Sequence, residues 1–334
     1  MTYIGIDVSK DSFVAAYPAK SGYTTKTFKN TSSGVHQFIQ SLPAECHCVM
    51  EATGNYSMLL LYLLQQANIT VSMENPQKIK HFARAMLSTT KTDKIDAQLI
   101  ALYGEKMNPS SYKIPSESII LLKQKRTVLR QLKKQLTATL NLQHALSALP
   151  KQDPTSKVTV EKTISFLRKQ ISKMEEEITN LSNKEFNRQM TLLTSIKGIS
   201  NTIASALITA TGGFTYFSSA KQISRFLGLC PTYQQSGTSI NVKGHINRNG
   251  DSYLRSQLFI SAMPTMRFNK ACRELYERLR ANGKSGKVAL IAVANKLIRQ
   301  AFAVIKSGSP YIDGFVSQPP LLKPATKAIY TSSL

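Results

Sequence analysis

Tryptophan is absent from this chain of 334 residues, cysteine is scarce, and acidic residues number 19 against 43 lysines and arginines. The four cysteines, Cys46, Cys48, Cys230 and Cys272, form no recognisable disulfide framework, which is typical of proteins in a reducing compartment. No apolar run reaches the roughly 20 residues that a membrane-spanning helix needs, and the N-terminus lacks a signal-peptide pattern. We therefore expect a cytoplasmic protein with no membrane partner.

The excess of basic residues gives a formal net charge of +24 and a sequence pI near 9.9. Such a balance favours a polyanionic partner, because each lysine or arginine placed on a phosphate releases a counterion. The basic residues are spread along the whole chain, which favours nucleic acid over a membrane surface. Hydrophobic residues make up 42% of the chain, enough for buried cores.

The first hundred residues alternate short apolar runs of strand and helix periodicity. The expected strands are 3–8, 13–17, 23–28, 46–50 and 69–73. The expected helices are 35–42, 56–66, 76–86 and one that begins near 92. Three strands joined by hairpins and followed by alternating helix and strand describe a ribonuclease-H-like α/β fold over residues 1–112.

The middle of the chain, residues 113–185, is expected to be helical. Leucines from 122 to 136 form one stripe of a long basic helix, and apolar residues from 164 to 181 alternate spacings of three and four. This second run is a heptad seam, which predicts a helical hairpin or coiled-coil insertion. Two helices packed on their own domain are an equally good interpretation.

A third region, residues 186–312, is expected to be a mostly helical domain. Apolar residues lead into Lys197-Gly198-Ile199-Ser200, and an alanine-rich helix follows at 201–210, a pattern typical of a helix-hairpin-helix module that holds a DNA phosphate. The further expected helices are 220–227, 252–268 and 287–306. Residues 313–334 are proline-rich and unpatterned, which predicts a flexible tail.

Four carboxylates stand at positions that favour a metal-binding site. Asp7 lies within the first apolar strand, where a carboxylate is costly unless it binds a cation or is hydrogen-bonded. Glu51 follows the strand 46–50 directly, and sites in α/β sheets form at strand ends. Asp93 and Asp96 are three residues apart at a helix start and project from one face. Four such carboxylates suit a pair of Mg²⁺ ions that promote an in-line phosphoryl displacement.

Each of these acids has a plainer interpretation as well. Asp93 would favour the positive end of a helix dipole, Glu51 would serve as a turn residue, and Asp7 would cap a loop. Glu74, also at a strand end, is the natural competitor and ranks lower, because Asn75-Pro76 turns the chain away. Cys46-His47-Cys48 lacks a second ligand pair at metal-binding spacing, so its cysteines are expected to alternate along a buried strand.

Three segments in the first region resemble the N-terminal blocks of a known family: YIGIDVSK at 3–10, MEATGNY at 50–56 and KTDKIDAQ at 91–98. They are similar to the DEDD transposases of the IS110 insertion-sequence family, the Piv/MooV-related group with a RuvC-like nuclease fold. LLTSIKGIS at 192–200 resembles the start of the family's C-terminal transposase domain. RFLGLCPTYQQSGTS and NRNGDSYLR, within 225–255, resemble the segment that carries its nucleophilic serine. Ser200 departs from the family pattern, which has a second glycine there.

The resemblance implies roles for particular residues. It makes Asp7, Glu51, Asp93 and Asp96 the metal-binding acids and Ser236 the catalytic serine. From the residues alone, Ser236 is equally a hydroxyl of a Ser-Gly-Thr-Ser turn, with Ser239 as the nearest alternative and Thr238 a distant one. Basic residues near these segments are candidates for phosphate contacts, with solvated surface as the alternative. They are Lys197, Lys243, His245, Arg248 and Arg255.

The resemblance further implies an RNA-guided DNA recombinase that acts through a covalent phosphoserine intermediate. Its partners would be donor and target DNA, a non-coding guide (bridge) RNA and further copies of the chain, as dimers that assemble into tetramers. It would lie in the bacterial cytoplasm, associated with the nucleoid. Two other functions fit the residues: a RuvC-like junction endonuclease that uses metal-activated water, and a nucleic-acid-binding protein without activity.

Overall fold

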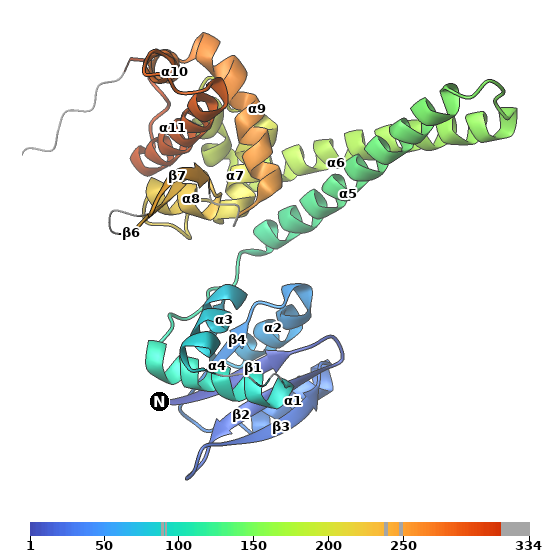
Figure 1. Cartoon of the computed structure of the whole chain (residues 1–334). Coiled ribbons are helices and arrows are strands. Elements are labelled where there is room, and N and C mark those ends of the chain that lie inside the picture. The colour runs from blue at the N-terminus through green and yellow to red at the C-terminus, as the bar shows by residue number, and fades with distance from the viewer. Residues whose placement is uncertain (88–89, 91, 237–239, 247–249, 315–334) are drawn as a thin grey trace, which may run out of the picture. The chain divides into compact units, whose positions relative to one another are not determined.

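The computed structural model describes residues 1–87, 90, 92–236, 240–246 and 250–314, with the backbone alone for the described residues between 232 and 245. The chain divides into two compact units, residues 1–114 and 115–334 (Figure 1). The first contains a mixed sheet with helices on both faces, and the second is mainly helical.

The first unit is built on a five-stranded sheet with the order β3-β2-β1-β4-β5. Its strands are β1 (Thr2–Val8), β2 (Ser12–Pro18), β3 (Tyr23–Lys29), β4 (Cys46–Glu51) and β5 (Thr70–Glu74). β1, β2 and β3 pair antiparallel through hairpins, whereas β4 and β5 run parallel to β1. This is the ribonuclease-H-like topology that the sequence predicts, and the five strands fall within about one residue of their expected bounds.

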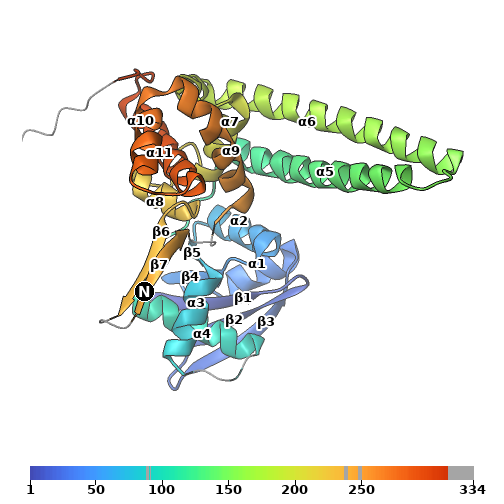
Figure 2. The same ribbon diagram turned by 45° about the horizontal axis from the view of Figure 1, so that its top comes forward.

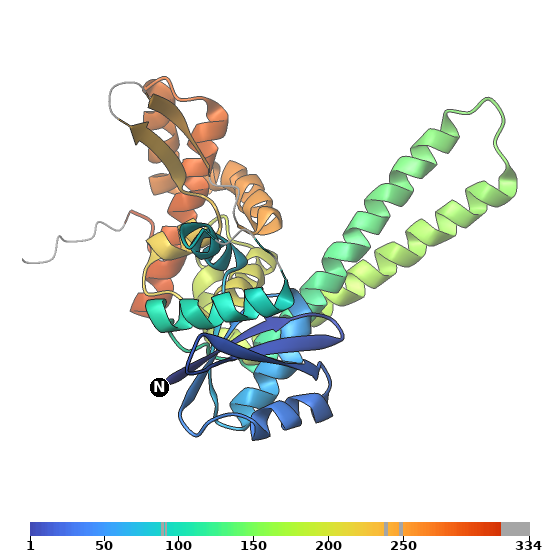
Figure 3. The same ribbon diagram turned by 60° about the horizontal axis from the view of Figure 1, so that its bottom comes forward.

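Two sets of helices cover the two faces of this sheet (Figure 3). One set comprises α1 (Ser32–Gln40) and α2 (Met58–Gln66), with a short 3-10 turn η1 (Gly54–Ser57) before α2. Their apolar side chains pack with the even-numbered residues of β1 in one core. The opposite face carries α3 (Pro76–Ala85) and α4 (Asp93–Met107), which pack on Val14, Ala16 and Val49.

Two glycines allow α4 to approach the sheet closely. A Cβ atom on Gly5 of β1 would lie 2.1 Å from the carbonyl oxygen of Ala97 and 2.2 Å from the nitrogen of Ala101. A Cβ atom on Gly104 of α4 would lie 2.8 Å from a ring carbon of Tyr3. α4 therefore runs opposite to β1, with its C-terminal half over Tyr3 and its N-terminal half over Gly5.

The second unit begins with a helical hairpin. α5 (Glu117–Ser147) and α6 (Pro154–Thr194) lie side by side, joined by a short turn (Figure 2). Ion pairs link them: Lys133 Nζ lies 2.6 Å from Glu175 Oε1, and Lys125 pairs with Glu177. The hairpin is the predicted one, and its heptad residues Ile164, Ile171 and Ile178 are buried. α6 leaves helical geometry at Phe186, where the sequence places the start of the third region.

The remaining helices share one core with the inner ends of α5 and α6. They are α7 (Asn201–Thr211), α8 (Ala220–Phe226), α9 (Ser252–Phe268), α10 (Lys270–Ala281) and α11 (Gly286–Ser307). Two features were not expected from the sequence: α10, and an antiparallel pair of strands, β6 (Pro231–Ser236) and β7 (Ile240–Ile246). Whether 113–185 and 186–312 are separate domains stays a prediction.

α11 is long and apolar enough to cross a membrane by length and composition, with a mean hydropathy of 1.7 over its most apolar window. In this unit, however, its side chains at Val293, Leu297 and Ala301 are fully buried in the shared core. A core helix of a soluble protein has the same properties, so α11 is weak evidence for a membrane span.

Candidate functional site

Asp7 and Glu51 lie at the ends of neighbouring parallel strands. β1 and β4 pair in register up to Ile6 and Met50, and Asp7 and Glu51 are the residues that follow that pair. Adjacent strands are about 4.8 Å apart, and residues in register point to the same face. Both side chains are half-buried, on the face that α4 covers. The two carboxylates predicted from strand position are therefore neighbours at the C-terminal ends of β1 and β4, along one edge of the sheet.

The first turn of α4 lies toward the same edge. Thr92 caps the helix by accepting the N–H of Ile95 at 3.3 Å, and Asp93 and Asp96 follow within the first turn. Asp93 precedes Ala97 by one helical turn, about 6 Å of rise, and Ala97 packs over Gly5. Asp7 lies two residues beyond Gly5, about 6.6 Å along the strand. The backbone thus directs all four acids toward one end of the sheet.

The donor set at this edge consists of carboxylate oxygens, the ligands that hard cations such as Mg²⁺ prefer. Within the part of the chain that the structure describes, however, no three histidine, cysteine or acidic side chains are grouped closely enough to hold a metal ion as they stand. Asp7, Glu51 and Asp96 already interact with neighbouring groups. The backbone arrangement fits a divalent cation, and the side chains would have to turn toward it.

Glu74, the competing acid, lies beside Glu51 in the sheet. The two residues are in register on β5 and β4, so Asn75-Pro76 does not carry Glu74 away from this edge. Its side chain is about 10% exposed, and Lys78 Nζ lies 2.7 Å from its Oε2. The hydrogen bond to Glu74 raises the pKa of Lys78. The lysine, which follows at the i+4 position on α3, was the sequence signal for a structural role.

Asn30 connects the loops that follow Asp7 and Glu51. Its side-chain nitrogen donates to the carbonyl oxygens of Ser9 at 3.0 Å and Tyr56 at 2.9 Å, with a longer contact of 3.4 Å to Lys10. Ser9 follows β1 and Tyr56 lies in η1 beyond β4. One amide thus fixes the ends of two strands relative to each other, a role that no local sequence pattern indicated.

The Cys46-His47-Cys48 segment is not a metal site. The two cysteines lie in the core beneath α1 and α2, as expected for alternate residues of a buried strand. His47 faces the other way, where its Nε2 lies 2.7 Å from the Ser72 hydroxyl and its ring stacks on Tyr3. Burial lowers the pKa of His47. The three side chains therefore cannot converge on one ion.

Ser236 is the last residue of β6, where the backbone pairs with Ile240 of β7. It stands at the end of the hairpin that carries the predicted serine segment; its side chain lies outside what the structure describes. The alternatives Thr238 and Ser239, and also Arg248, lie outside the described residues. Lys243 and His245 belong to β7 and are described by their backbone alone.

The predicted helix-hairpin-helix turn joins α6 to α7. Gly198 has φ of +109°, and a Cβ atom there would lie 1.8 Å from the Thr265 hydroxyl oxygen, so only glycine fits. Ser200 caps α7, with its hydroxyl oxygen 3.4 Å from the nitrogen of Ile203. The Ser200 hydroxyl thus accepts a hydrogen bond from one of the N–H groups that a phosphate would use. Lys197, beside it, is exposed.

Arg255 has a structural partner. Its Nη1 donates to the carbonyl oxygen of Leu227 at 3.1 Å, at the C-terminal end of α8. Its side chain is half-buried between α8 and α9. Arginine at this position stabilises the unpaired carbonyls at a helix end. The prediction of a phosphate contact took no account of this hydrogen bond.

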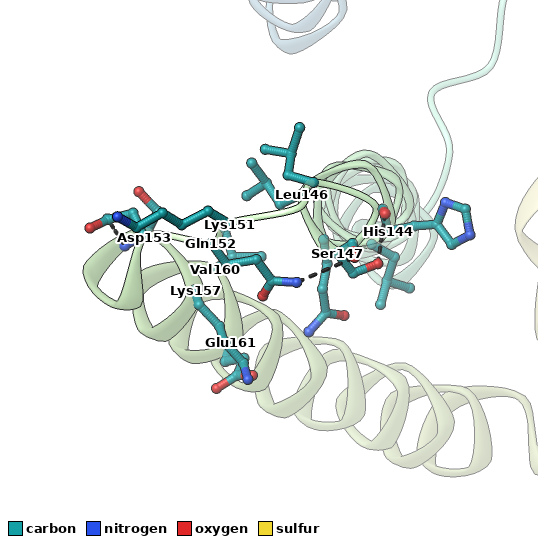
Figure 4. Close-up of a pocket in the computed structure, with 13 residues that line it drawn as sticks. His144, Leu146, Ser147, Lys151, Gln152, Asp153, Lys157, Val160 and Glu161 are labelled. Atoms are coloured by element: carbon teal, nitrogen blue, oxygen red, sulfur yellow. Dashed lines mark hydrogen bonds between the residues drawn. The ribbon is translucent and has the colours of Figure 1, made fainter.

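A hollow of about 570 Å³ lies at the tip of the α5–α6 hairpin (Figure 4). Asp153 is committed there as the cap of α6, accepting the N–H of Ser156 at 2.7 Å, and Gln152 donates to the carbonyl of Ser147. The lining mixes leucines with single charges of both signs, such as Lys157 and Glu161. This arrangement has no cluster of acids suited to phosphoryl transfer, so we do not assign the candidate site here.

Comparison with known protein families gives two matches. The profile of DEDD transposases of the IS110 type, described as "Transposase", matches residues 4–149. A profile described as "Transposase IS116/IS110/IS902 family" matches residues 190–277. Together they include all four acids and the segment with Ser236.

Two relatives are similar over almost the full chain. The pilin gene-inverting protein of Moraxella bovis is 33% identical over 324 residues, which cover 93% of this chain and 97% of the relative. The transposase for insertion sequence element IS1328 of Yersinia enterocolitica is 25% identical over 341 residues, covering 93% and 98%. Among solved structures, T. thermophilus RuvC in complex with a Holliday junction substrate matches 34% of this chain and 99% of its own, with 13% identity and a TM-score of 0.25.

Proposed function

Because this chain belongs to the IS110 family of DEDD transposases and recombinases, we propose that it recombines DNA with an acidic cluster in its first unit and a serine in its second. Family membership makes it a DNA-processing enzyme. The acids of the proposal are Asp7, Glu51, Asp93 and Asp96, and the nucleophile is Ser236.

One observation carries the assignment of the acids. Asp7 and Glu51 end two adjacent parallel strands, and Gly5 allows α4 to approach so closely that its first turn extends toward the same edge. Carboxylate oxygens placed side by side at strand ends are the ligands that Mg²⁺ prefers. A protein that only binds DNA gains nothing from grouping acids beside a phosphate, because like charges repel.

In the proposed reaction, the hydroxyl oxygen of Ser236 attacks the phosphorus of a DNA phosphodiester. A bond from serine oxygen to phosphorus forms, and the bond from phosphorus to one sugar oxygen breaks. The serine hydroxyl loses its proton, and the departing sugar oxygen gains one. Attack by a hydroxyl from the partner strand then reverses these changes and releases Ser236. The number of phosphodiester bonds is conserved, so no external energy source is needed.

The four acids would hold Mg²⁺, and two such ions would stabilise the charge that develops on the attacking and leaving oxygens. A serine hydroxyl is a weak nucleophile at its ordinary pKa, so it depends on groups near it for activation. Ser236 and the acids belong to different units, and the proposal requires them to meet at one phosphate, within one chain or between two copies.

The proposal extends to guidance by a non-coding RNA that pairs with donor and target DNA, and to tetramers assembled from dimers. The support is the family itself and the charge of the chain, +24 at pH 7. Where base pairing reads the sequence, the protein needs mainly phosphate contacts, and these require basic side chains rather than specific base contacts.

The test combines the chain with guide RNA, two DNA partners and Mg²⁺, and compares the wild type with Asp7→Asn and Ser236→Ala. We expect recombinant product from the wild type alone, and a covalent protein–DNA adduct that Ser236→Ala cannot form. Cleavage without any adduct on a denaturing gel would favour a junction endonuclease. Binding without Mg²⁺-dependent strand chemistry would favour an inactive nucleic-acid-binding protein.

A further inference from the structure

Four cations on α5 share one face of the helix. Lys123, Arg126, Arg130 and Lys134 are spaced by three, four and four residues, which keeps them within less than a quarter turn of one another at 3.6 residues per turn. Three of them are exposed and Arg126 is half-buried. We call these four residues the α5 basic stripe.

The stripe differs from the other cations of α5 in its partners. Lys125 and Lys133 are paired with Glu177 and Glu175 of α6. Among the described residues, by contrast, no carboxylate lies within salt-bridge distance of any member of the stripe. The acids of the hairpin therefore neutralise one side of α5 and leave the stripe with its full charge.

The stripe borders a hollow of about 560 Å³ between α5 and the start of α9. Arg130, Lys133 and Lys134 line it from α5, and Ser252, Tyr253 and Ser256 line it from α9. The guanidinium carbon of Arg130 lies 5.6 Å from the centre of the Tyr253 ring, a cation–π distance that orients the arginine. The Tyr253 ring, the Ser252 hydroxyl and the stripe cations Arg130 and Lys134 thus line one open space.

Arg126 lies one turn before Arg130, and its burial lowers the pKa of its guanidinium. The carboxylate of Asp251 acts on it from a distance and raises that pKa, but Asp251 is already committed as the cap of α9, accepting the N–H groups of Tyr253 and Leu254 at 3.0 and 3.1 Å. Partial burial of a cation without a bound anion is unfavourable, and an anionic ligand would offset that cost.

We propose that the α5 basic stripe and the adjoining hollow bind the sugar–phosphate backbone of a nucleic-acid strand. Arg126, Arg130 and Lys134 recur every 6 Å along the helix, at about 1.5 Å per residue, a repeat comparable with that of successive phosphates along one strand. The Ser252 hydroxyl adds a hydrogen-bond donor, and such a contact positions a strand without reading its bases. This inference rests on the proposed function only for the presence of a nucleic-acid partner.

The test measures binding without chemistry, in EDTA, so that failure of the proposed catalytic mechanism does not affect the result. The full chain is titrated onto a labelled DNA duplex and an RNA hairpin of the same length over a series of KCl concentrations. The stripe variant carries Arg126→Gln, Arg130→Gln and Lys134→Gln. The control carries Lys157→Gln, Lys162→Gln and Lys169→Gln, which removes the same charge from exposed positions of α6.

Each lost phosphate contact lowers the slope of log K against log salt by about one. We expect the stripe variant to lose about three units of slope with DNA, RNA or both, and the control to keep the wild-type slope; the probe that responds identifies the ligand. Unchanged slopes with both probes, or an equal loss in the control, would overturn the proposal. Glutamine favours helix, and Arg130→Gln and Lys134→Gln tested singly should each remove about one unit of slope.

Discussion

Glu51 and Glu74 are partners across the parallel strands β4 and β5, and Lys78 holds Glu74 with its Nζ 2.7 Å from Glu74 Oε2. Two carboxylates on neighbouring strands repel each other unless a cation offsets their charge. Lys78 supplies that cation to Glu74 from the first turns of α3. Of these two neighbouring acids, Glu74 is paired with Lys78, whereas Glu51 is one of the four acids of the proposed metal site.

This difference predicts opposite results for two matched substitutions. Glu51→Gln removes a proposed metal ligand and should lower recombination by at least about a hundredfold, a loss typical of a transition-state interaction worth ~3 kcal/mol. Glu74→Gln keeps the size of the side chain and should leave activity within a few-fold of the wild type. Product formation on gels with added Mg²⁺ measures both. Equal losses would mean that Glu74 shares in the chemistry.

The proposed nucleophile makes a separate prediction. Ser236→Ala should abolish the covalent protein–DNA adduct, because a methyl group has no oxygen to attack phosphorus. Ser239→Ala, three residues further along the same segment, should still form the adduct. Denaturing gels of a labelled DNA substrate distinguish the two variants. An adduct that disappears with Ser239→Ala and persists with Ser236→Ala would transfer the role to Ser239.

Gly5 is predicted to be essential for the position of α4. A Cβ atom there would lie 2.1 Å from the carbonyl oxygen of Ala97, so Gly5→Ala would displace the helix that carries Asp93 and Asp96. Overpacking of this kind costs about 1–3 kcal/mol, and we expect a lower melting temperature together with reduced activity. Gly286→Ala is the control, since a Cβ atom there meets nothing nearer than 3.4 Å. A Gly5→Ala protein with wild-type stability and activity would contradict this account of the packing.

The first unit could be predicted well because its local patterns agree with its tertiary packing. Strands such as 46–50 are short apolar runs bounded by polar residues, and Asp7 and Glu51 follow from their places on them. The pairing of Glu74 with Lys78 had a local signal, because the lysine follows four residues later. The bridge made by Asn30 had none, because it depends on which strand ends lie together, and this is set by sheet order.

The second unit was predicted less completely. α10 has a periodic pattern, with Cys272 buried and Tyr276 and Leu279 following at helical spacing, but it is short and rich in charge. β6 and β7 contain glutamine, serine, lysine and glycine, which weaken the alternation that marks a strand. In both cases long-range packing determines the structure, and the local sequence is ambiguous.

Cys272 is predicted to make stability depend on pH at alkaline values. Burial raises the pKa of its thiol from an ordinary value of 9.0 to about 11 in the folded chain. Between these values the unfolded chain releases a proton that the folded chain keeps, so stability present below pH 9 is lost as pH rises toward 11. The expected loss is about 2–3 kcal/mol in the free energy of unfolding. Denaturant titrations at several pH values measure it.

The control for this prediction is a matched pair of substitutions. Cys272→Ala should reduce the loss of stability between pH 9 and pH 11, whereas Cys230→Ala, at a half-buried position, should retain it in full. Cys272→Ala also removes a buried sulfur, so it should start from a somewhat lower stability at neutral pH. An unchanged alkaline slope in Cys272→Ala would assign that slope to another group.

Substitutions of Arg255 can distinguish a role in the fold from a role in phosphate binding. Its Nη1 donates to the Leu227 carbonyl at 3.1 Å and thereby stabilises the end of α8. Arg255→Ala should lower the free energy of unfolding by about 1–2 kcal/mol, because the carbonyl of the buried Leu227 loses a charged donor. The salt dependence of DNA binding should stay that of the wild type, since the guanidinium is already engaged.

Arg255→Lys is the informative companion, because lysine keeps the charge but loses the planar geometry that reaches Leu227. If Arg255 acts only in the fold, Arg255→Lys should also be destabilised and should bind DNA with an unchanged salt slope. If Arg255 instead contacts a phosphate, Arg255→Ala should lose about one unit of slope while Arg255→Lys keeps it. Melting curves and salt titrations on the same two proteins therefore distinguish a residue that stabilises α8 from one that holds the DNA backbone.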